Sequence, residues 1–262
     1  HDIVNPNGLA YIIVSVIPFF YFFSSISWRI RAISLVVFPL LIYALVLTQS
    51  RSGMIALFII IFTIILRSKY KLLFSIIVII VACVIFINLG EQQKDRYASI
   101  IDFDAKNAAT AQGRIEGIKS SFLVALHKPI FGHGLGTSAE ANANFADHAQ
   151  PAHNLYVEIA EEIGFVGLII YILFMKSIIK NYVLSNKIFK QNLRENSFLT
   201  NCTIAMQVWL AMNIIFSLVS YGLSGYAWYL FAGFSVVLLR LSSNRNTIAA
   251  STILKPSMKK IY

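Results

Sequence analysis

The sequence predicts an all-α polytopic membrane protein with about seven transmembrane helices and one large, partly helical external loop. Three observations predict this class: 57% of the 262 residues are hydrophobic, only 13% are charged, and the apolar residues gather in long segments. Soluble domains carry about 25% charged and about 45–50% apolar residues, so a soluble globular enzyme and a disordered chain are both excluded. The apolar segments cover residues 9–27, 32–48, 53–66, 72–89, 155–174, 203–219 and 226–241.

Each of these segments is expected to be a helix that crosses the bilayer. A span needs roughly 20 residues, with a range of about 17–25. The bilayer interior has no water to satisfy backbone N–H and C=O groups, so a spanning segment must satisfy them internally as a helix. The whole chain, residues 1–262, is therefore predicted to be a single membrane domain.

The distribution of Lys and Arg predicts which way the helices run. Fifteen of the 22 Lys and Arg residues lie in alternate connections, at residues 28–31, 67–71, 176–194 and 240–262, and the one acid of these connections is Glu195, directly after the third range. The positive-inside rule makes these connections cytoplasmic. The N-terminus is then outside and the basic tail at residues 242–262 is cytoplasmic. The same distribution explains the net charge of +10 by topology, so membrane lipid is the expected partner and nucleic acid is not.

The external loop, residues 90–154, is polar and holds four of the five histidines. Within it, residues 113–127 are predicted to form an amphipathic helix that lies on or near the membrane surface. The apolar positions Ile115, Ile118, Phe122 and Leu126 recur every three or four residues, which is the helical period. A structured external loop on a helical bundle is where functional residues are expected.

Arg51 lies between two short apolar segments, which together leave too few residues for two complete crossings and a turn. Its connection is therefore expected to dip below the outer surface, where an arginine needs a partner or a wet cavity. One interpretation is an anion-binding arginine in a recess. The other is an interfacial arginine that reaches up to lipid phosphates.

Arg114 and His153 are the other candidate site residues. The guanidinium of Arg114 suits phosphate oxygens, although a surface pair with Glu116 or an aspartate is an alternative. His153 lies where the polar loop meets the fifth apolar segment, and its near-neutral pKa suits a general base, although a lone histidine is more often structural. Asn154 or a residue beside it can cap the following helix.

The histidines do not predict a metal site. His127, His133, His148 and His153 show neither the i, i+4 pair of a helical zinc site nor a His-Glu-x-x-His motif. The glycine-rich residues 132–136 lack a preceding strand and the third glycine spacing of a dinucleotide site. They predict instead a tight loop whose amides face outward.

Several short motifs occur in an order that resembles the O-antigen ligase and O-antigen polymerase superfamily of bacterial envelope glycosyltransferases. The resemblance covers roughly residues 1–175. The motifs are Asn5-Pro6-Asn7-Gly8, Ser50-Arg51-Ser52-Gly53, Gly113-Arg114, Lys128-Pro129-Ile130-Phe131-Gly132-His133-Gly134-Leu135-Gly136, His153-Asn154-Leu155-Tyr156 and Glu162-Ile163-Gly164-Phe165-Val166-Gly167.

The resemblance implies a C-type glycosyltransferase (GT-C-like) membrane architecture whose N-terminal helices are expected to be missing from this chain. It also implies an undecaprenyl-pyrophosphate-linked glycan donor, and inverting, metal-independent transfer without a cofactor. By motif, Arg51 and Arg114 would hold the pyrophosphate and His153 would be the catalytic base. Glu162 and Asn154 would support them.

The expected location is the bacterial inner membrane, with the active site facing the periplasm, in lipopolysaccharide or surface polysaccharide biosynthesis. The acceptor stays open: lipid A-core for an O-antigen ligase, another repeat unit for an O-antigen or capsule polymerase, or a protein for an O-oligosaccharyltransferase. Outside the enzyme class, the alternative is a lipid-linked glycan transporter, which the absence of an internal repeat disfavours.

Overall fold

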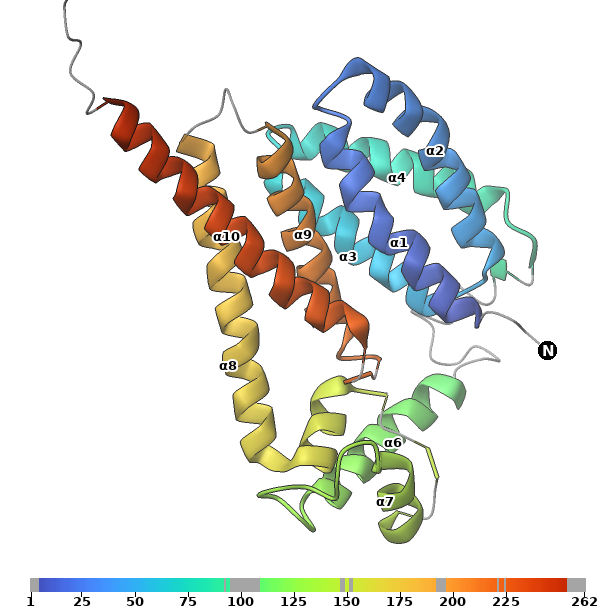
Figure 1. Ribbon diagram of the computed structural model, residues 1–262. Coiled ribbons are helices and arrows are strands. Elements are labelled where there is room, and N and C mark those ends of the chain that lie inside the picture. The colour runs from blue at the N-terminus through green and yellow to red at the C-terminus, as the bar shows by residue number, and fades with distance from the viewer. Residues whose placement is uncertain are drawn as a thin grey trace, which may run out of the picture.

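The computed structural model describes residues 5–91, 93–94, 109–146, 149–150, 153–191, 197–220, 222–223 and 225–253, and all regular structure within them is helical. The helices, which Figure 1 labels, are α1 (Pro6–Phe23), α2 (Trp28–Leu47), α3 (Arg51–Arg67), α4 (Lys71–Ile87), α6 (Ala109–Ala125), α7 (Ser138–Phe145), α8 (Leu155–Gln191), α9 (Ser197–Phe216) and α10 (Tyr226–Ile253).

The long helices form a bundle, and α6 and α7 lie together at one end of it (Figure 1). In the bundle, α9 packs against α1, α3 and α8, while α10 packs along α8. The core therefore joins helices that are far apart in the sequence, with Val14, Ile60, Met212 and Phe231 among its buried side chains.

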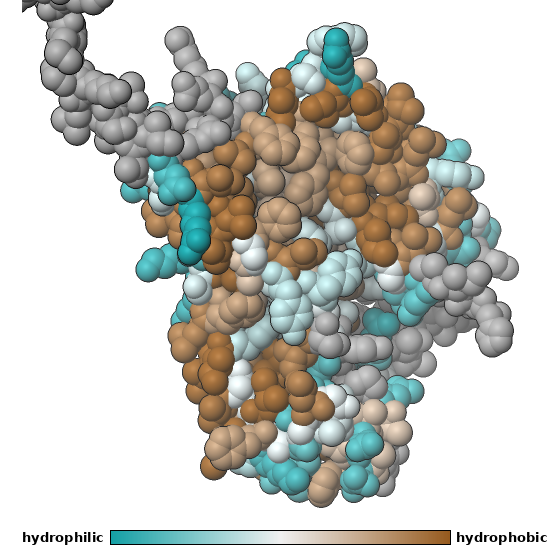
Figure 2. Space-filling model, in the orientation of Figure 1, coloured by the Kyte–Doolittle hydropathy of each residue, from teal (hydrophilic) through white to brown (hydrophobic). Residues whose placement is uncertain are grey.

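The outer surface of the bundle is apolar. Leu35 on α2 and Leu72 on α4 are more than 70% exposed, and α4 buries no residue at all. Figure 2 shows hydrophobic residues over the bundle and hydrophilic ones gathered around α6 and α7. An apolar surface of this extent is unfavourable in water and favourable in lipid, so the chain is an all-α, multi-pass membrane protein.

Five helices, α1, α2, α8, α9 and α10, are long and apolar enough to cross a membrane. They correspond to five of the seven predicted spans. Helices α3 and α4, the other two, have 17 residues each. At 1.5 Å per residue each is about 26 Å long, somewhat less than the roughly 30 Å hydrocarbon core. The seven-span count stays a prediction.

Local capping explains where the first three helices begin. The side chains of Asn5, Ser27 and Ser50 each accept a hydrogen bond from a backbone N–H two or three residues ahead, at 3.0, 3.3 and 3.0 Å. These side chains satisfy N–H groups that have no partner within the helix. The local sequence therefore determines where these three helices begin.

The predicted helix at residues 113–127 forms as α6, which runs from Ala109 to Ala125. Ile115, Phe122 and Leu126, on the predicted apolar stripe, are exposed. The small residues Ser121 and Ala125 are fully buried, because α6 packs closely against α7 and α8. The apolar stripe remains available to a membrane surface, and that contact stays a prediction.

Helix α8 differs most from its predicted form. The sequence predicts one span over residues 155–174, whereas α8 has 37 residues and breaks at Gly164, whose φ is 72° and ψ −179°. The break divides α8 into a short first arm, which lies beside α6 and α7, and a long second arm, which runs through the bundle (Figure 1). Hydropathy cannot reveal such a break, because apolar residues continue on both sides of it.

The glycine-rich loop at residues 132–136 caps the C-terminal end of the first arm of α8. The backbone N–H of His133 donates to the carbonyl of Glu161 at 2.8 Å, and that of Gly134 donates to the carbonyl of Glu162 at 2.9 Å. These carbonyls end a helix and would otherwise lack partners. The expectation that the loop amides face outward is wrong for these two, because they cap the helix end.

Candidate functional site

A cavity of about 380 Å³ opens where the bundle meets α6 and the first arm of α8. Its walls come from the start of α1, the start of α3, the first turns of α6, the residues just before α8, and the end of α9 with the connection to α10. Ligand sites in proteins are typically concave and about 300–1,000 Å³, so the cavity has the size of a binding site.

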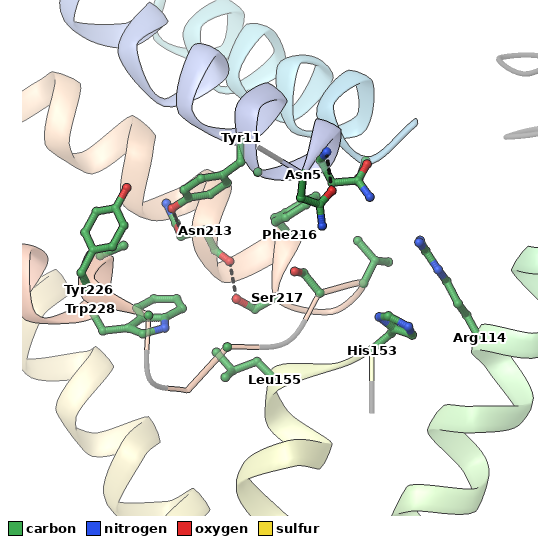
Figure 3. Close-up of a pocket in the computed structure, with 18 residues that line it drawn as sticks. Asn5, Tyr11, Arg114, His153, Leu155, Asn213, Phe216, Ser217, Tyr226 and Trp228 are labelled. Atoms are coloured by element: carbon green, nitrogen blue, oxygen red, sulfur yellow. Dashed lines mark hydrogen bonds between the residues drawn. The ribbon is translucent and has the colours of Figure 1, made fainter. Parts of the chain in front are cut away.

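Arg114 and His153 line this cavity together. Arg114 extends from α6 and His153 from the segment before α8, and Figure 3 shows both at the same end of the cavity. Both side chains are half-buried. Of the alternative partners of Arg114, Glu116 forms no salt bridge with it: within the described ranges the salt bridge at 4.0 Å or less is Lys94–Glu91. The aspartates lie outside the described residues.

The environment of His153 favours its neutral form. Burial lowers its pKa from the ordinary value of 6.5, and the positive charge of Arg114 lowers it further. Both effects disfavour the imidazolium, because one removes solvent and the other adds a like charge. A neutral imidazole beside a cation can accept a proton from a nearby hydroxyl at neutral pH.

Arg51 is the first residue of α3 and lies next in sequence to a residue of the cavity wall. It is half-buried, and its neighbour Ser52 lines the cavity, while Arg51 is not one of the lining residues. Its position is held by Asn7, whose side-chain oxygen accepts hydrogen bonds from Ser50 at 2.6 Å and from Ser52 at 3.2 Å. The motifs around Asn7 and Arg51 thus meet in space.

Asn154 caps α8, as the sequence predicts. Its side-chain oxygen accepts hydrogen bonds from the N–H groups of Tyr156 at 2.9 Å and Val157 at 3.2 Å. Its amide nitrogen donates to the carbonyl of Leu218 at 3.1 Å, beyond the end of α9. Asn154 therefore fixes the segment that carries His153 both to α8 and to the connection that follows α9.

The three carboxylates of the first arm of α8 are buried, and they differ in their contacts. Glu158 accepts hydrogen bonds from the N–H groups of Gly222 at 2.7 Å and Leu223 at 3.4 Å, and so holds the connection between α9 and α10. Glu161 is fully buried, and neither of its side-chain oxygens has a hydrogen-bond partner among the described residues. Glu162 is 3% exposed and does not line the cavity.

The sequence analysis missed the part of the cavity that lies furthest from Arg114. There the lining includes Tyr11, Asn213, Ser217, Tyr226 and Trp228 (Figure 3). One signal was available, because a polar side chain such as Asn213 inside a membrane-spanning helix is unfavourable unless it faces a partner or a cavity.

A second hollow, of about 430 Å³, adjoins His153 and is lined by residues of α6 and by Ala149 and Gln150. His153 lines both spaces. Over the described ranges, no three His, Cys, Asp or Glu side chains lie close enough to hold a metal ion.

Comparison with protein families gives one match. Residues 35–172, more than half of the 262-residue chain, match the family described as O-antigen ligase. The matched range contains Arg51, Arg114 and His153, while Tyr11, Asn213 and Tyr226 lie outside it. A comparison with curated proteins finds no match.

Proposed function

Because this chain belongs to the O-antigen ligase family, we propose that it transfers glycan from an undecaprenyl-pyrophosphate donor at the periplasmic face of the bacterial inner membrane. The observation that carries the proposal is the shared cavity of Arg114 and His153 at one end of an apolar bundle. An anion-binding group and a proton acceptor are the two groups that glycosyl transfer from a diphosphate donor requires.

The proposed topology has seven spans, with the N-terminus outside and residues 242–262 in the cytoplasm. The distribution of Lys and Arg supports it, since the basic connections all fall on the side opposite to residues 90–154. The cavity then faces the periplasm, where a lipid-linked glycan is accessible and nucleotide sugars are not needed.

In the proposed mechanism, Arg114 and Arg51 bind the pyrophosphate. His153 removes the proton from an acceptor hydroxyl as its oxygen forms a bond to the anomeric carbon. The bond from that carbon to the pyrophosphate breaks, the configuration inverts, and the arginines stabilise the negative charge on the leaving group. No metal is needed when guanidinium groups provide this charge. The acceptor approaches His153 from the second hollow.

Asn154 and Glu162 have supporting roles in this proposal. Asn154 positions His153 through its cap of α8 and its bond to Leu218. Glu162 orients the histidine or the acceptor. Because Glu162 is buried and lines neither the cavity nor the second hollow, orientation of the histidine is favoured over contact with the acceptor.

Replacement of Arg114 tests the pyrophosphate site. We expect Arg114→Ala to weaken binding of undecaprenyl pyrophosphate about tenfold or more, because a hydrogen bond to a charged group contributes about 1.5–3 kcal/mol. Arg114→Lys keeps the positive charge but loses the forked geometry of the guanidinium group. Its affinity for undecaprenyl pyrophosphate should therefore lie between that of wild type and that of Arg114→Ala. The exposed Lys119, on the same helix but outside the cavity, supplies the control variant Lys119→Ala. Equal affinities for all four proteins would contradict the assignment.

The pH dependence of transfer tests the state of His153. We expect kcat/KM to rise with pH along an acid limb centred below 6.5 and then to level off, since protonated His153 cannot accept a proton. Arg114→Gln removes a charge that lowers the pKa of His153, so the limb should move to higher pH, whereas Arg114→Lys should leave it in place. The measurement is kcat/KM between about pH 5 and 8. An acid limb of kcat/KM that stays at the same pH in Arg114→Gln would contradict the proximity of Arg114 to the catalytic histidine.

A gene-deletion strain identifies the acceptor. Loss of the long-chain lipopolysaccharide ladder with polymer retained on the carrier lipid indicates a ligase. A single-repeat band indicates a polymerase, and normal lipopolysaccharide with an unmodified protein indicates a protein glycosylase. Unchanged glycans of every kind would contradict the proposal, and donor that crosses reconstituted vesicles without reacting would favour a transporter.

A further inference from the structure

The two ends of the cavity differ in chemistry. Arg114 and His153 are the basic residues of its lining, and both lie at one end (Figure 3). The opposite end is lined by uncharged hydrogen-bonding groups and aromatic rings, those of Tyr11, Asn213 and Tyr226 among them. A ligand that fits both ends carries an anionic part and a neutral part rich in hydroxyl groups.

The aromatic end is held in place by buried contacts. Trp228, which is 6% exposed, meets Tyr171 edge-on at 5.7 Å between ring centroids and also contacts Phe231. The hydroxyl of Tyr11 donates to the side-chain oxygen of Asn213 at 2.5 Å, which joins α1 to α9. Side chains fixed in this way lose little further freedom when a ligand binds.

Tyr226, in contrast, lines the cavity without being buried. It is the first residue of α10 and is 60% exposed. An exposed tyrosine ring beside fixed hydrogen-bonding groups suits a flat, partly apolar ligand, because the ring face attracts weakly polarised C–H groups.

We propose that this end of the cavity is a sugar subsite, which binds the pyranose ring attached to the donor pyrophosphate. The inference rests on the proposed function and extends it to the glycan. The C–H face of the sugar stacks on Tyr226, and its hydroxyl groups face Tyr11, Asn213 and Ser217. These residues lie outside residues 35–172, the range matched to the family.

The polar groups at this end argue against the hydrocarbon chain of the carrier lipid as the occupant. Tyr11, Asn213 and Ser217 already donate hydrogen bonds within the protein. The oxygens of Tyr11 and Ser217 keep lone pairs that can accept from a sugar hydroxyl group and that a hydrocarbon chain would leave without a partner. A second anion is equally unsuited, since Arg114, the cationic side chain of the lining, is at the other end.

The test compares two lipids in nanodiscs that contain the full chain: undecaprenyl pyrophosphate, and the same lipid carrying one N-acetylglucosamine. We expect wild-type protein to bind the sugar-bearing lipid more tightly. Tyr226→Ala should reduce this preference roughly 3- to 10-fold and leave the affinity for the bare lipid unchanged. Tyr226→Phe keeps the ring and should keep most of the preference.

Tyr229→Ala is the matched control. Tyr229 lies one turn further along α10, is 70% exposed and does not line the cavity, so its loss should change neither affinity. Wild-type protein that binds both lipids equally would overturn the subsite. So would a Tyr226→Ala variant that binds both lipids equally more weakly, because that result places the hydrocarbon chain at Tyr226.

The Arg114→Ala variant separates this inference from the proposed function. If it binds both lipids as wild type does while Tyr226→Ala loses the sugar preference, the pyrophosphate assignment fails and the sugar subsite stands. If it weakens both lipids while Tyr226→Ala has no effect, the sugar subsite fails and the pyrophosphate assignment stands.

Discussion

His153→Ala should lower the rate of glycan transfer by about 10²- to 10⁴-fold, the usual contribution of a positioned general base. The variant removes the proton acceptor from a half-buried position at the cavity wall, and the cap that Asn154 provides to α8 is left in place. We therefore expect normal amounts of folded protein and nearly normal binding of undecaprenyl pyrophosphate. The measurement is single-turnover transfer with purified full-length chain and saturating donor.

His127→Ala is the matched control for this experiment. His127 lies two residues after the end of α6, is exposed, and its ring is tilted against that of Phe145 with 4.9 Å between ring centroids. It lines neither the cavity nor the second hollow, so its loss should leave the rate unchanged. Transfer by His153→Ala at the wild-type rate would refute the base assignment, whatever His127→Ala does.

Gly164→Ala should have the largest effect on folding. A Cβ atom at Gly164 would lie 2.1 Å from the carbonyl oxygen of Ile130, far inside van der Waals contact. The residue also has a positive φ with an extended ψ, a conformation open essentially to glycine alone, which costs other residues about 1–3 kcal/mol. The clash with a backbone atom adds to this cost, because backbone cannot rotate away as a flexible side chain can.

The destabilisation by Gly164→Ala would reach the site through the loop at residues 129–136, which packs against the break in α8. The N–H of Phe165 donates to the carbonyl of Pro129 at 2.8 Å, directly beside the break. A shift of Gly164 away from Ile130 separates this pair and frees the first arm of α8, which carries the capped segment of His153. We expect little folded Gly164→Ala protein in membranes, as measured by fluorescence-detected size-exclusion chromatography and thermal stability.

Gly233→Ala is the corresponding control. Gly233 is also in a long helix, α10, but a Cβ atom there meets nothing within 4 Å. Alanine favours helix over glycine by about 0.4–1 kcal/mol when the conformation permits it, so this variant should be at least as stable as wild type. Equal stability of Gly164→Ala and Gly233→Ala would show that the break in α8 does not depend on its contacts with the loop at residues 129–136.

Features that depend on neighbouring residues could be predicted from the sequence, whereas features that depend on contacts between distant residues could not. The starts of α1, α2 and α3 follow from Asn5, Ser27 and Ser50, because a cap acts on backbone groups two or three residues away. Helix α7 escaped prediction, since it is short and its residues show no clear apolar period. The apolar stripe of α6 was predicted, but its contact face within the protein was not, since close packing against α7 and α8 buries small residues such as Ser121 and Ala125.

The site shows the same division. The sequence placed Arg51, Arg114 and His153 on one side of the membrane, because charge distribution and hydropathy report topology. It could not show that Arg114 and His153 share a cavity while Ser52, next to Arg51, contributes to the wall. It also could not place Tyr226 opposite Arg114, since the start of α10 reaches the cavity only through the packing of α10 along α8.

By itself, then, the sequence determined that this is a helical membrane protein. It predicts, in addition, basic connections on one side of the membrane and a polar segment with an arginine and a histidine on the other. Composition, helical period and capping act over a few residues, so they can be seen without a fold. Only the tertiary structure decided that Gly132 and Gly164 bring two distant backbones together and that a cationic and an aromatic end form one cavity. These features depend on contacts between residues far apart along the chain, and such contacts exist only once the helices have packed.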